Sequence, residues 1–278
     1  MSDVRPATAL GAQPGAEVLR EPAALTRARR WGRLEAALVP LAILIAWQGL
    51  SASGAFPAYA FPPPVTVFRT LGKMVVDGSL ALHVVQSFGR QLAGFALAIL
   101  LGFPAGLLLG TSDRVREALM PTFRLFYPIP GIAWVPLAIL WFGIGFQALV
   151  FSIFTTCFFP IMMNTFAGVV AIDPTHRMVM QVFGTPRWLA YRRVILPSAM
   201  PFVMAGLRLA YGVGWRVIIG AEMIGATTGL GYMMDNARWQ MRPDIVLGGM
   251  VAIGVIGLAI ETAFFDFLER RTIGKWSA

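Results

Sequence analysis

The chain has 278 residues, of which 57% are hydrophobic and only 13% are charged, and its mean hydropathy is +0.68. Because about a quarter of the residues of an ordinary soluble domain are charged, this composition excludes that class and predicts a protein that lies in a bilayer. The 23 Lys and Arg residues exceed the 14 Asp and Glu residues and give a net charge of +9, which in a membrane protein is expected in cytoplasmic loops and needs no nucleic acid to explain it.

The N-terminal part predicts a polar tail followed by a first membrane helix. Residues 1–33 are rich in Ala, Pro, Gly and Arg and show no apolar period, which is typical of a disordered basic cytoplasmic tail. The uncharged window 36–56 is long enough to cross a hydrocarbon core of about 30 Å as a helix. A signal peptide cleaved near residues 51–53 is the alternative. Its charged leader is too long for that, so we expect a retained helix.

An external amphipathic segment follows this first helix. Apolar residues recur at helical spacing between Thr66 and Met74, with Arg69 and Lys73 on the opposite face. The pattern predicts a short helix at the membrane interface. Residues 34–80 are therefore assigned to the first span and this segment.

Residues 81–267 are predicted to contain five more membrane helices. Windows 91–112 and 245–260 each fit one span, and 202–223 fits another although it contains Arg208, Arg216 and Glu222. Window 125–172 has 48 residues without a charge (172 − 124). It predicts two helices, 126–142 and 147–170, with a turn at Gly143 to Gly145. The fold class is thus an all-α membrane protein of six transmembrane helices, with a cytoplasmic tail at 268–278.

The basic residues predict the orientation of the six helices. If the helices alternate in direction, the side with the N-terminus carries fifteen basic residues and the other side carries four. This bias places both termini in the cytoplasm. The fifteen are Arg5, Arg20, Arg27, Arg29, Arg30, Arg33, Arg114, Arg116, Arg177, Arg187, Arg192, Arg193, Arg270, Arg271 and Lys275, and the four are Arg69, Lys73, Arg238 and Arg242.

The loop 173–198 is the one substantial polar segment between predicted spans. Asp173 before a proline is a helix-start signal, and Gly184 is a helix-stop signal, so a first short helix is expected at 175–183. A second is expected from Arg187 to Leu196, ending at Pro197. Such a hairpin either lies on the membrane surface or docks a cytosolic partner, because it presents Trp188 together with several arginines.

Motifs along the chain resemble the permease subunits of ABC importers of the nitrate/sulfonate/taurine type. The resemblance covers residues 61–276 and implies the type I importer fold. It is carried by the following stretches: Tyr127-Pro128-Ile129-Pro130, Ala133-Trp134-Val135-Pro136, Trp141-Phe142-Gly143-Ile144-Gly145, Phe159-Pro160-Ile161 with Asn164-Thr165, Gly206-Leu207-Arg208, Ala221-Glu222-Met223-Ile224-Gly225 and Gly229-Leu230-Gly231.

The same resemblance implies that the loop 173–198 docks in a groove of the ATPase. The matching residues are Gly184, Thr185, Pro186, Arg187 and Trp188, then Leu196 and Pro197; the Glu-Ala-Ala start of the family loop is absent, and Met178, Val179 and Met180 stand in its place. Implied partners are two copies of a cytosolic ATPase, a periplasmic solute-binding protein and a second permease copy. No GxxxxGK[ST] motif is present, so ATP and Mg would be bound by the partner, and this chain is expected to have neither cofactor nor enzyme activity.

Charged residues within the spans are candidates for the translocation path. Arg208 and Arg216 lie about 80° apart around a helix, and guanidinium groups suit a sulfonate or nitrate oxyanion. The alternatives are that Arg208 reaches cytoplasmic headgroups and that Arg216 pairs with Glu222 or Glu261. Glu222 is either a gating residue or a structural partner of the glycine-rich turn after it.

Prolines and glycines predict either packing or a path. Pro128, Pro130, Pro136 and Pro160 must kink their helices, through packing or beside a water-lined path, so Trp134 and Asn164 are further path candidates. Gly102, Gly106 and Gly110 repeat every four residues and predict close helix packing. Cys157 is expected to pack, and His83 and His176 have no metal-site pattern.

The leading prediction is an inner-membrane permease for a small anion such as an aliphatic sulfonate, taurine or nitrate. Pyrimidine precursors and aromatic acids remain open as cargo. The rival class is a self-contained secondary transporter, which would be expected to show inverted repeats. An intramembrane enzyme would need paired acidic groups or a histidine within the spans.

Overall fold

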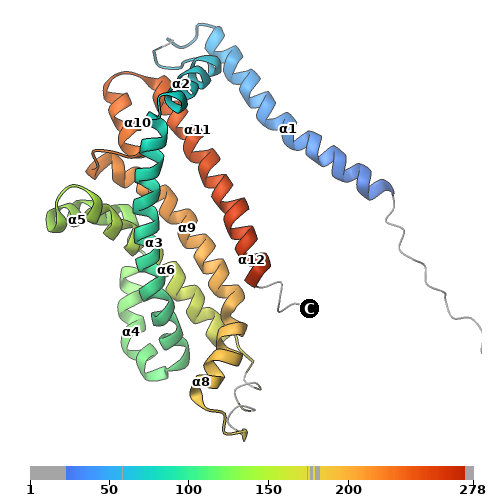
Figure 1. The fold of residues 1–278 in the computed structure, drawn as a ribbon, viewed down its shortest axis with the longest axis vertical. Coiled ribbons are helices and arrows are strands. Elements are labelled where there is room, and N and C mark those ends of the chain that lie inside the picture. Colours follow the sequence, from blue (N-terminus) through green and yellow to red (C-terminus); the bar gives the residue numbers. More distant parts are fainter. Residues whose placement is uncertain (1–22, 58, 174, 176–177, 179–181, 273–278) are drawn as a thin grey trace, which may run out of the picture. The chain divides into compact units, whose positions relative to one another are not determined.

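The computed structural model describes residues 23–57, 59–173, 175, 178 and 182–272, and the regular elements in this part of the chain are all helical. The chain divides into two units, residues 1–56 and 57–278. We describe each unit by itself. Figure 1 gives the labels of the helices.

The first unit contains helix α1 (Ala23–Ala52). The helix begins within the segment predicted to be a disordered tail, so the boundary at residue 33 is corrected. Within the described residues its apolar part is Leu38–Ala52. The predicted window 36–56 overlaps the C-terminal half of this helix and extends four residues beyond its end at Ala52. Residues 1–22 lie outside the described residues.

The second unit contains the remaining helices. Four are long and apolar enough to cross a membrane, or five when a bent pair counts as one span. In chain order the elements are α2 (Pro64–Val76), α3 (Ser79–Thr111), α4 (Asp113–Phe126), η1 (Gly131–Trp134), α5 (Val135–Phe142), α6 (Phe146–Val170), α8 (Arg187–Ala190), η2 (Tyr191–Ile195), α9 (Leu196–Gly225), α10 (Leu230–Trp239), α11 (Pro243–Ala259), η3 (Ile260–Phe265) and α12 (Asp266–Thr272).

Helix α2 confirms the predicted short amphipathic helix. It buries Val67 and leaves Arg69 and Lys73 exposed. At its end Asp77 Oδ1 accepts hydrogen bonds from the hydroxyl (2.6 Å) and the backbone N–H (2.9 Å) of Ser79. Both bonds favour the ionised carboxylate, so they hold the pKa of Asp77 below its usual value.

The predicted single helix 126–142 is wrong, although the kink expected from its first two prolines is present. Helix α4 starts at Asp113 and ends at Phe126, and the segment Gly131–Phe142 continues at 86° to it. Pro128 and Pro130 lie in the break, where each lacks the N–H that an α-helix would use. The uncharged window marked apolar residues but gave no signal of direction.

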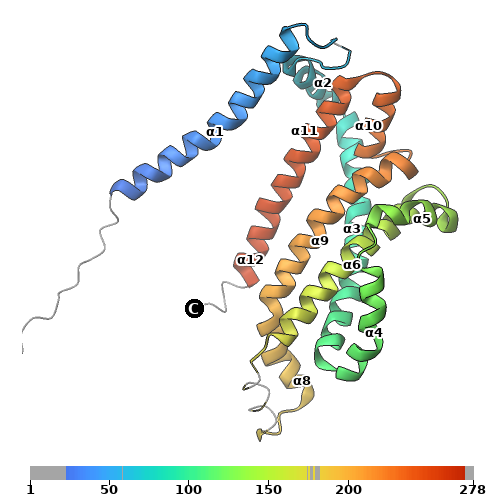
Figure 2. The same ribbon diagram turned by 180° about the vertical axis from the view of Figure 1, so that it is seen from behind.

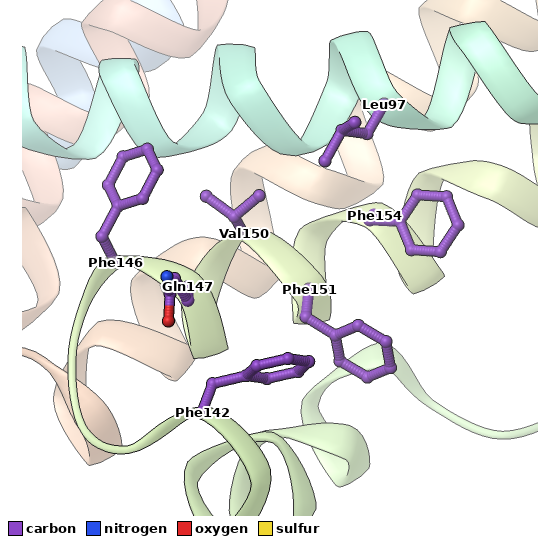
Figure 3. A pocket seen from close by; sticks show the side chains of 7 residues that line it. All are labelled: Leu97, Phe142, Phe146, Gln147, Val150, Phe151 and Phe154. Atoms are coloured by element: carbon purple, nitrogen blue, oxygen red, sulfur yellow. The ribbon is translucent and has the colours of Figure 1, made fainter.

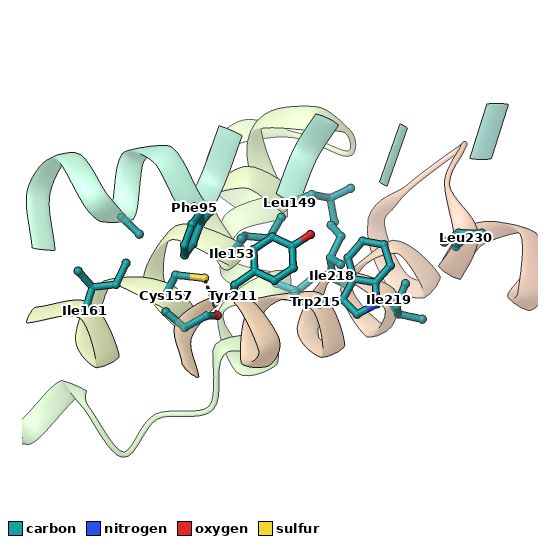
Figure 4. Packing of buried hydrophobic residues seen from close by; sticks show 14 of the residues in the cluster. Phe95, Leu149, Ile153, Cys157, Ile161, Tyr211, Trp215, Ile218, Ile219 and Leu230 are labelled. Atoms are coloured by element: carbon teal, nitrogen blue, oxygen red, sulfur yellow. Dashed lines mark hydrogen bonds between the residues drawn. The ribbon is translucent and has the colours of Figure 1, made fainter. Parts of the chain in front are cut away.

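Close packing of α3 on α6 confirms the prediction from the glycine spacing. A Cβ at Gly102, Gly106 or Gly110 would lie 2.9, 2.5 or 2.5 Å from atoms of α6, so any larger residue would force the two helices apart. Figures 1 and 2 show α3, α6 and α9 side by side in both views. Their shared core includes Cys157, whose thiol donates to the Ala210 carbonyl at 3.3 Å, as Figure 4 shows. The packing role predicted for Cys157 is confirmed.

The predicted stop at Pro197 is wrong. Helix α8 passes through the π-helical turn η2 directly into α9, so that 188–225 is one continuous helical run. Pro197 stands at the start of α9, directly after the π-helical turn. The Leu196 N–H donates to the Tyr191 carbonyl, which spans five residues and closes the π turn.

Candidate functional site

The loop 173–198 keeps the local signals that the sequence contains. Asp173 Oδ1 accepts a hydrogen bond of 2.7 Å from the Thr175 N–H, which confirms the predicted N-cap. Gly184 has φ +57°, a left-handed conformation that glycine adopts most readily. His176, Arg177 and Val179 to Gln181 lie outside the described residues.

The described part of this loop presents apolar side chains to its surroundings. Met178, Val182, Phe183 and Trp188 are each more than 60% exposed. Clusters of this kind mark sites of protein or membrane interaction. Pro186 is exposed and Thr185, Leu196 and Pro197 are half-buried, while nothing is described of the Arg187 side chain.

Helix α9 uses one face to pack on α6. At Gly206 a Cβ would lie 2.6 Å from Asn164 Cβ, and at Gly214 it would lie 2.7 Å from Cys157 Sγ. Asn164, half-buried, donates from Nδ2 to the Pro160 carbonyl at 2.8 Å. The structure therefore places Asn164 at a helix–helix contact of α6 and α9.

A second face of α9 meets the last helices. Trp215 Nε1 donates to the Ile253 carbonyl of α11 at 3.3 Å. The Tyr211 and Phe265 rings lie 5.5 Å apart, and the Arg208 guanidinium forms an ion pair with Asp266. Asp266, which sequence reasoning missed, is thus the partner of the first candidate arginine.

The third face of α9 is exposed, and Arg216 lies on it. Its members are mostly small or apolar. Ala205, Leu209, Gly212 and Arg216 recur every three or four residues, and Met223 follows two turns after Arg216. Arg216 Nε donates to the Gly212 carbonyl of its own helix at 3.1 Å. Within the described residues no ion pair joins Arg216 to Glu222 or Glu261, so the predicted alternative of pairing with Glu222 is wrong.

One turn beyond Arg216 this face meets η1. A Cβ at Gly220 would lie 2.6 Å from the Ile132 side chain. Trp134 follows on the same short element, half-buried, with ring contacts to Phe126 and Phe151 at 6.2 Å each. Helix η1, which ends at Trp134, therefore contacts α9 at Gly220, one turn beyond Arg216.

Glu222 lies in a fully buried cluster at the opposite end of α9 from Pro197. Its carboxylate accepts from Arg90 Nη1 (2.6 Å), the Ser87 hydroxyl (2.8 Å) and the Gly231 N–H (2.9 Å). The side chains of Arg90 and Glu222 are 6% and 0% exposed. A carboxylate with no exposed surface lines no path in this conformation, so Glu222 takes the structural role among the two predicted alternatives.

The same cluster caps helix α10. The Leu230 N–H donates to the Ser87 hydroxyl (2.8 Å) and the Gly229 N–H to His83 Nδ1 (3.1 Å). These N–H groups lie at the start of a helix, where its own residues offer them no acceptor. Arg90 also donates to the Thr228 carbonyl and hydroxyl, both at 2.7 Å. Helix α10 is therefore held by side chains of α3.

Sequence reasoning missed Arg90, Ser87 and His83 as members of this cluster. Window 91–112 begins directly after Arg90, so the window treated Arg90 as the end of a span. Helix α3 instead begins at Ser79. A signal was present, because Arg90 and Glu222 are opposite charges in apolar surroundings and such charges are paired when buried.

An apolar groove of about 340 Å³ opens beside α6 (Figure 3). Its wall is formed by side chains of α3, α5 and α6, and Gln147 is its one polar side chain. The lining residues are Leu97, Phe142, Phe146, Gln147, Val150, Phe151 and Phe154. Across the described residues no group of three or more His, Cys, Asp or Glu side chains could hold a metal ion.

Comparisons with known proteins agree with this architecture. Residues 98–273 match the family described as binding-protein-dependent transport system inner membrane component. The putative aliphatic sulfonates transport permease SsuC of Bacillus subtilis strain 168 is 33% identical, covering 89% of each chain. The taurine transport system permease TauC of Escherichia coli K12 is 34% identical, over 83% of this chain and 86% of its own length.

One further relative and one solved structure are also similar to this chain. The bicarbonate transport system permease CmpB of Synechococcus elongatus is 31% identical, over 87% of this chain and 92% of its own length. A solved inward-facing structure of the MetNI methionine ABC transporter superimposes with a TM-score of 0.61 at 17% identity, covering 68% of this chain and 94% of that chain. At this identity the likeness concerns the fold alone.

Proposed function

Because the chain belongs to the family of binding-protein-dependent inner-membrane transport components, we propose that it moves a small anionic solute across the inner membrane by alternating access. Aliphatic sulfonates, taurine and nitrate are the proposed cargo class. The relatives named for sulfonates, taurine and bicarbonate support an anion. The chain is a permease subunit and not an ATPase, and ATP hydrolysis takes place on a separate subunit.

The proposed topology has six spans. Helix α1 would add one span to the four long helices and the bent pair of α4 with η1 and α5. With alternating directions and the basic bias of the sequence, both termini would be cytoplasmic. The loop 173–198 then lies on the cytoplasmic side and the cluster around Glu222 on the outer side.

Arg216 carries the proposal of an anionic cargo. It lies in the middle of a helix long and apolar enough to span a membrane, on an exposed face, with no ion pair to a carboxylate among the described residues. A charge within a span is costly and is retained at functional positions. We assign the exposed face of α9, with Trp134 beside it, to the translocation path. A second permease copy is proposed to close this path from the other side.

An uptake assay tests the cargo class. The permease, its ATPase and its binding protein would be reconstituted in vesicles, and uptake of taurine, an aliphatic sulfonate and nitrate measured. Arg216→Gln should lower uptake about ten- to hundredfold, the size of one charged hydrogen bond of ~1.5–3 kcal/mol. Arg124→Gln, at an exposed arginine of α4, is the matched control. Equal uptake by both variants would refute the role of Arg216.

The exposed apolar residues of the loop 173–198 support docking of the ATPase there. Met178, Gly184, Thr185, Pro186, Arg187, Trp188, Leu196 and Pro197 are the proposed coupling residues. Gly184→Leu should abolish stimulation of ATP hydrolysis by cargo while the protein remains in the membrane. Gly78→Leu is a matched control, because Gly78 also has a left-handed φ (+77°) and open space around it but lies between α2 and α3. Full coupling in the Gly184 variant would contradict the docking assignment.

One observation favours a second cargo for the same machinery. The groove of Figure 3 is lined by four phenylalanines, Phe142, Phe146, Phe151 and Phe154, and one amide. Aromatic walls suit an aromatic acid, whose ring would lie against them. Uptake of benzoate in the vesicles described above, inhibited by Phe151→Ala, would favour this cargo over a sulfonate.

A further inference from the structure

The two arginines of α9 differ in their partners. Arg208 forms an ion pair with Asp266 at the start of α12, whereas the bond given by Arg216 goes to a backbone carbonyl of its own helix. An ion pair already satisfies the charge of Arg208, so an incoming anion must replace the Asp266 carboxylate to reach it. Arg216 presents no such competitor among the described residues.

The ion pair of Arg208 is placed where it can open. The side chains of Arg208 and Asp266 are 36% and 45% exposed, and exposed pairs contribute little to stability. A cavity of about 140 Å³ adjoins the guanidinium, and its other lining residues are Pro201, Met204, Ala205 and Phe265. An anion therefore has space beside Arg208 and a weakly held competitor to displace.

Asp266 also follows a change in helix type. The π-helical turn η3 lies between α11 and α12 and brings Phe265 and Asp266 against α9. Inserted π turns occur frequently at functional sites. Of the contacts between α9 and the last helices, the ion pair is the one farthest along toward the N-terminal end of α9, which continues into the loop 173–198. It is the contact nearest to the proposed docking site.

We propose that Asp266 is a positioning residue that holds Arg208 until an anionic cargo takes its place, so that cargo arrival releases α12 from α9. The inference rests on the proposed anion path and adds an acidic residue to it. Arg216 lies eight residues from Arg208, which is about 12 Å along a helix. Cargo would thus pass from Arg216, which has no ion pair among the described residues, to Arg208, which is paired with Asp266. When the cargo leaves, the Arg208–Asp266 ion pair would form again.

A binding assay on the purified permease tests this proposal. Ethanesulfonate is the probe, chloride keeps the ionic strength constant, and the shift of the thermal midpoint gives an apparent Kd. Asp266→Asn removes the charge of this competitor and should bind the probe about two- to fivefold more tightly than the wild type, the range that an exposed ion pair permits. Arg208→Gln and the double variant should lack this gain. A purely structural tie predicts equal behaviour of Asp266→Asn and Arg208→Gln, and that result would overturn the proposal.

A second measurement leaves both residues of the pair in place. Spin labels at Leu209→Cys and Phe267→Cys, both exposed positions, report the distance between α9 and α12. Cys157 is buried and stays unlabelled. Ethanesulfonate should lengthen the distance, and an unchanged distance would refute release. Neither assay needs the ATPase or the binding protein. If Arg216→Gln weakens binding of ethanesulfonate and Asp266→Asn does not change it, only the proposed release is refuted. If Arg216→Gln leaves uptake unchanged, the proposed cargo class is refuted.

Discussion

Helix α9 carries two ion pairs, one near its C-terminal end through Glu222 and one near its middle through Arg208, and the pairs differ in burial. The Arg90–Glu222 pair is almost fully buried, and its carboxylate has two further donors, Ser87 and the Gly231 N–H. The Arg208–Asp266 pair is more than a third exposed. Breaking a buried pair leaves an uncompensated charge, whereas an exposed pair exchanges its partner for water. The difference indicates a fixed C-terminal end of α9 and, under our proposal, a releasable contact near its middle.

The fixed end also joins elements that are distant in sequence. Through Arg90 and Ser87, helix α3 holds the end of α9 and the start of α10. Detaching α10 would expose backbone N–H groups that have no other acceptor. The motion that we propose is therefore expected around Arg208, and four predictions test this contrast.

The largest effect is expected at Glu222. Glu222→Ala leaves Arg90 buried without its carboxylate and should lower the free energy of unfolding by about 3–5 kcal/mol. Asp266→Ala is the matched control and should cost less than about 1 kcal/mol. Unfolding of the purified protein in detergent by increasing denaturant measures both. Similar losses in the two variants would remove the contrast.

A smaller effect is expected from an added methyl group. At Gly231 a Cβ would overlap the Ile219 carbonyl oxygen and lie 2.8 Å from Glu222 Cβ. Gly231→Ala should cost about 1–3 kcal/mol through overpacking. At Gly212, beside Arg216, no atom lies within 4 Å, so Gly212→Ala should be neutral or raise stability through helix propensity. Denaturant unfolding compares the two, and a neutral Gly231 variant would show that the fixed end can shift.

Ser87→Ala should have the next largest effect. The hydroxyl donates to Glu222 and accepts from the Leu230 N–H, and leaving buried groups unsatisfied costs about 1–3 kcal/mol. Ser198, exposed in the first turn of α9, provides the control variant Ser198→Ala. Hydrogen exchange of the Leu230 amide should also accelerate in the Ser87 variant. An unchanged exchange rate would mean that α10 is held by other contacts.

The smallest effect is expected at Asp77. This residue is exposed and lies just before α3, at the end of the helix where Arg90 lies. Its pKa is lowered by the two hydrogen bonds from Ser79. A carboxyl group with a lowered pKa stabilises the fold above the unfolded-state pKa of about 4. This stabilisation is lost as the pH falls through the folded-state pKa. The thermal midpoint of the wild type should therefore fall slightly more below pH 4 than that of Asp77→Asn. A large difference between the two thermal midpoints would mean that the position of a contact in the fold, and not its burial, determines how much it stabilises the protein.

The sequence predicted those parts of the fold that depend on runs of neighbouring residues. Apolar windows located α3, α6, α9 and α11, and the spacing of Gly102, Gly106 and Gly110 predicted the close contact of α3 with α6. Asp173 and Gly184 are local signals, and both have the predicted roles at helix ends. The window 125–172, by contrast, did not reveal the 86° bend before α5, because hydropathy carries no direction.

The candidate site was predicted in part. Arg216 was found because a charge within an apolar run is visible in one dimension. Asp266 and Arg90 were missed, because their roles depend on which helices meet. Arg90 and Glu222 are 132 positions apart, and Arg208 and Asp266 are 58 apart.

The sequence by itself determined that the chain lies in a membrane and which stretches contain its long apolar helices, but not where each helix begins and ends. This is so because the transfer of residues into hydrocarbon adds up along the chain. Only the tertiary structure decided which charges are buried, paired or exposed, because a pair forms where two helices place their side chains within a few ångströms of each other. Burial then separates the Arg90–Glu222 pair, which holds the C-terminal end of α9, from the more exposed Arg208–Asp266 pair near its middle, which we propose can open.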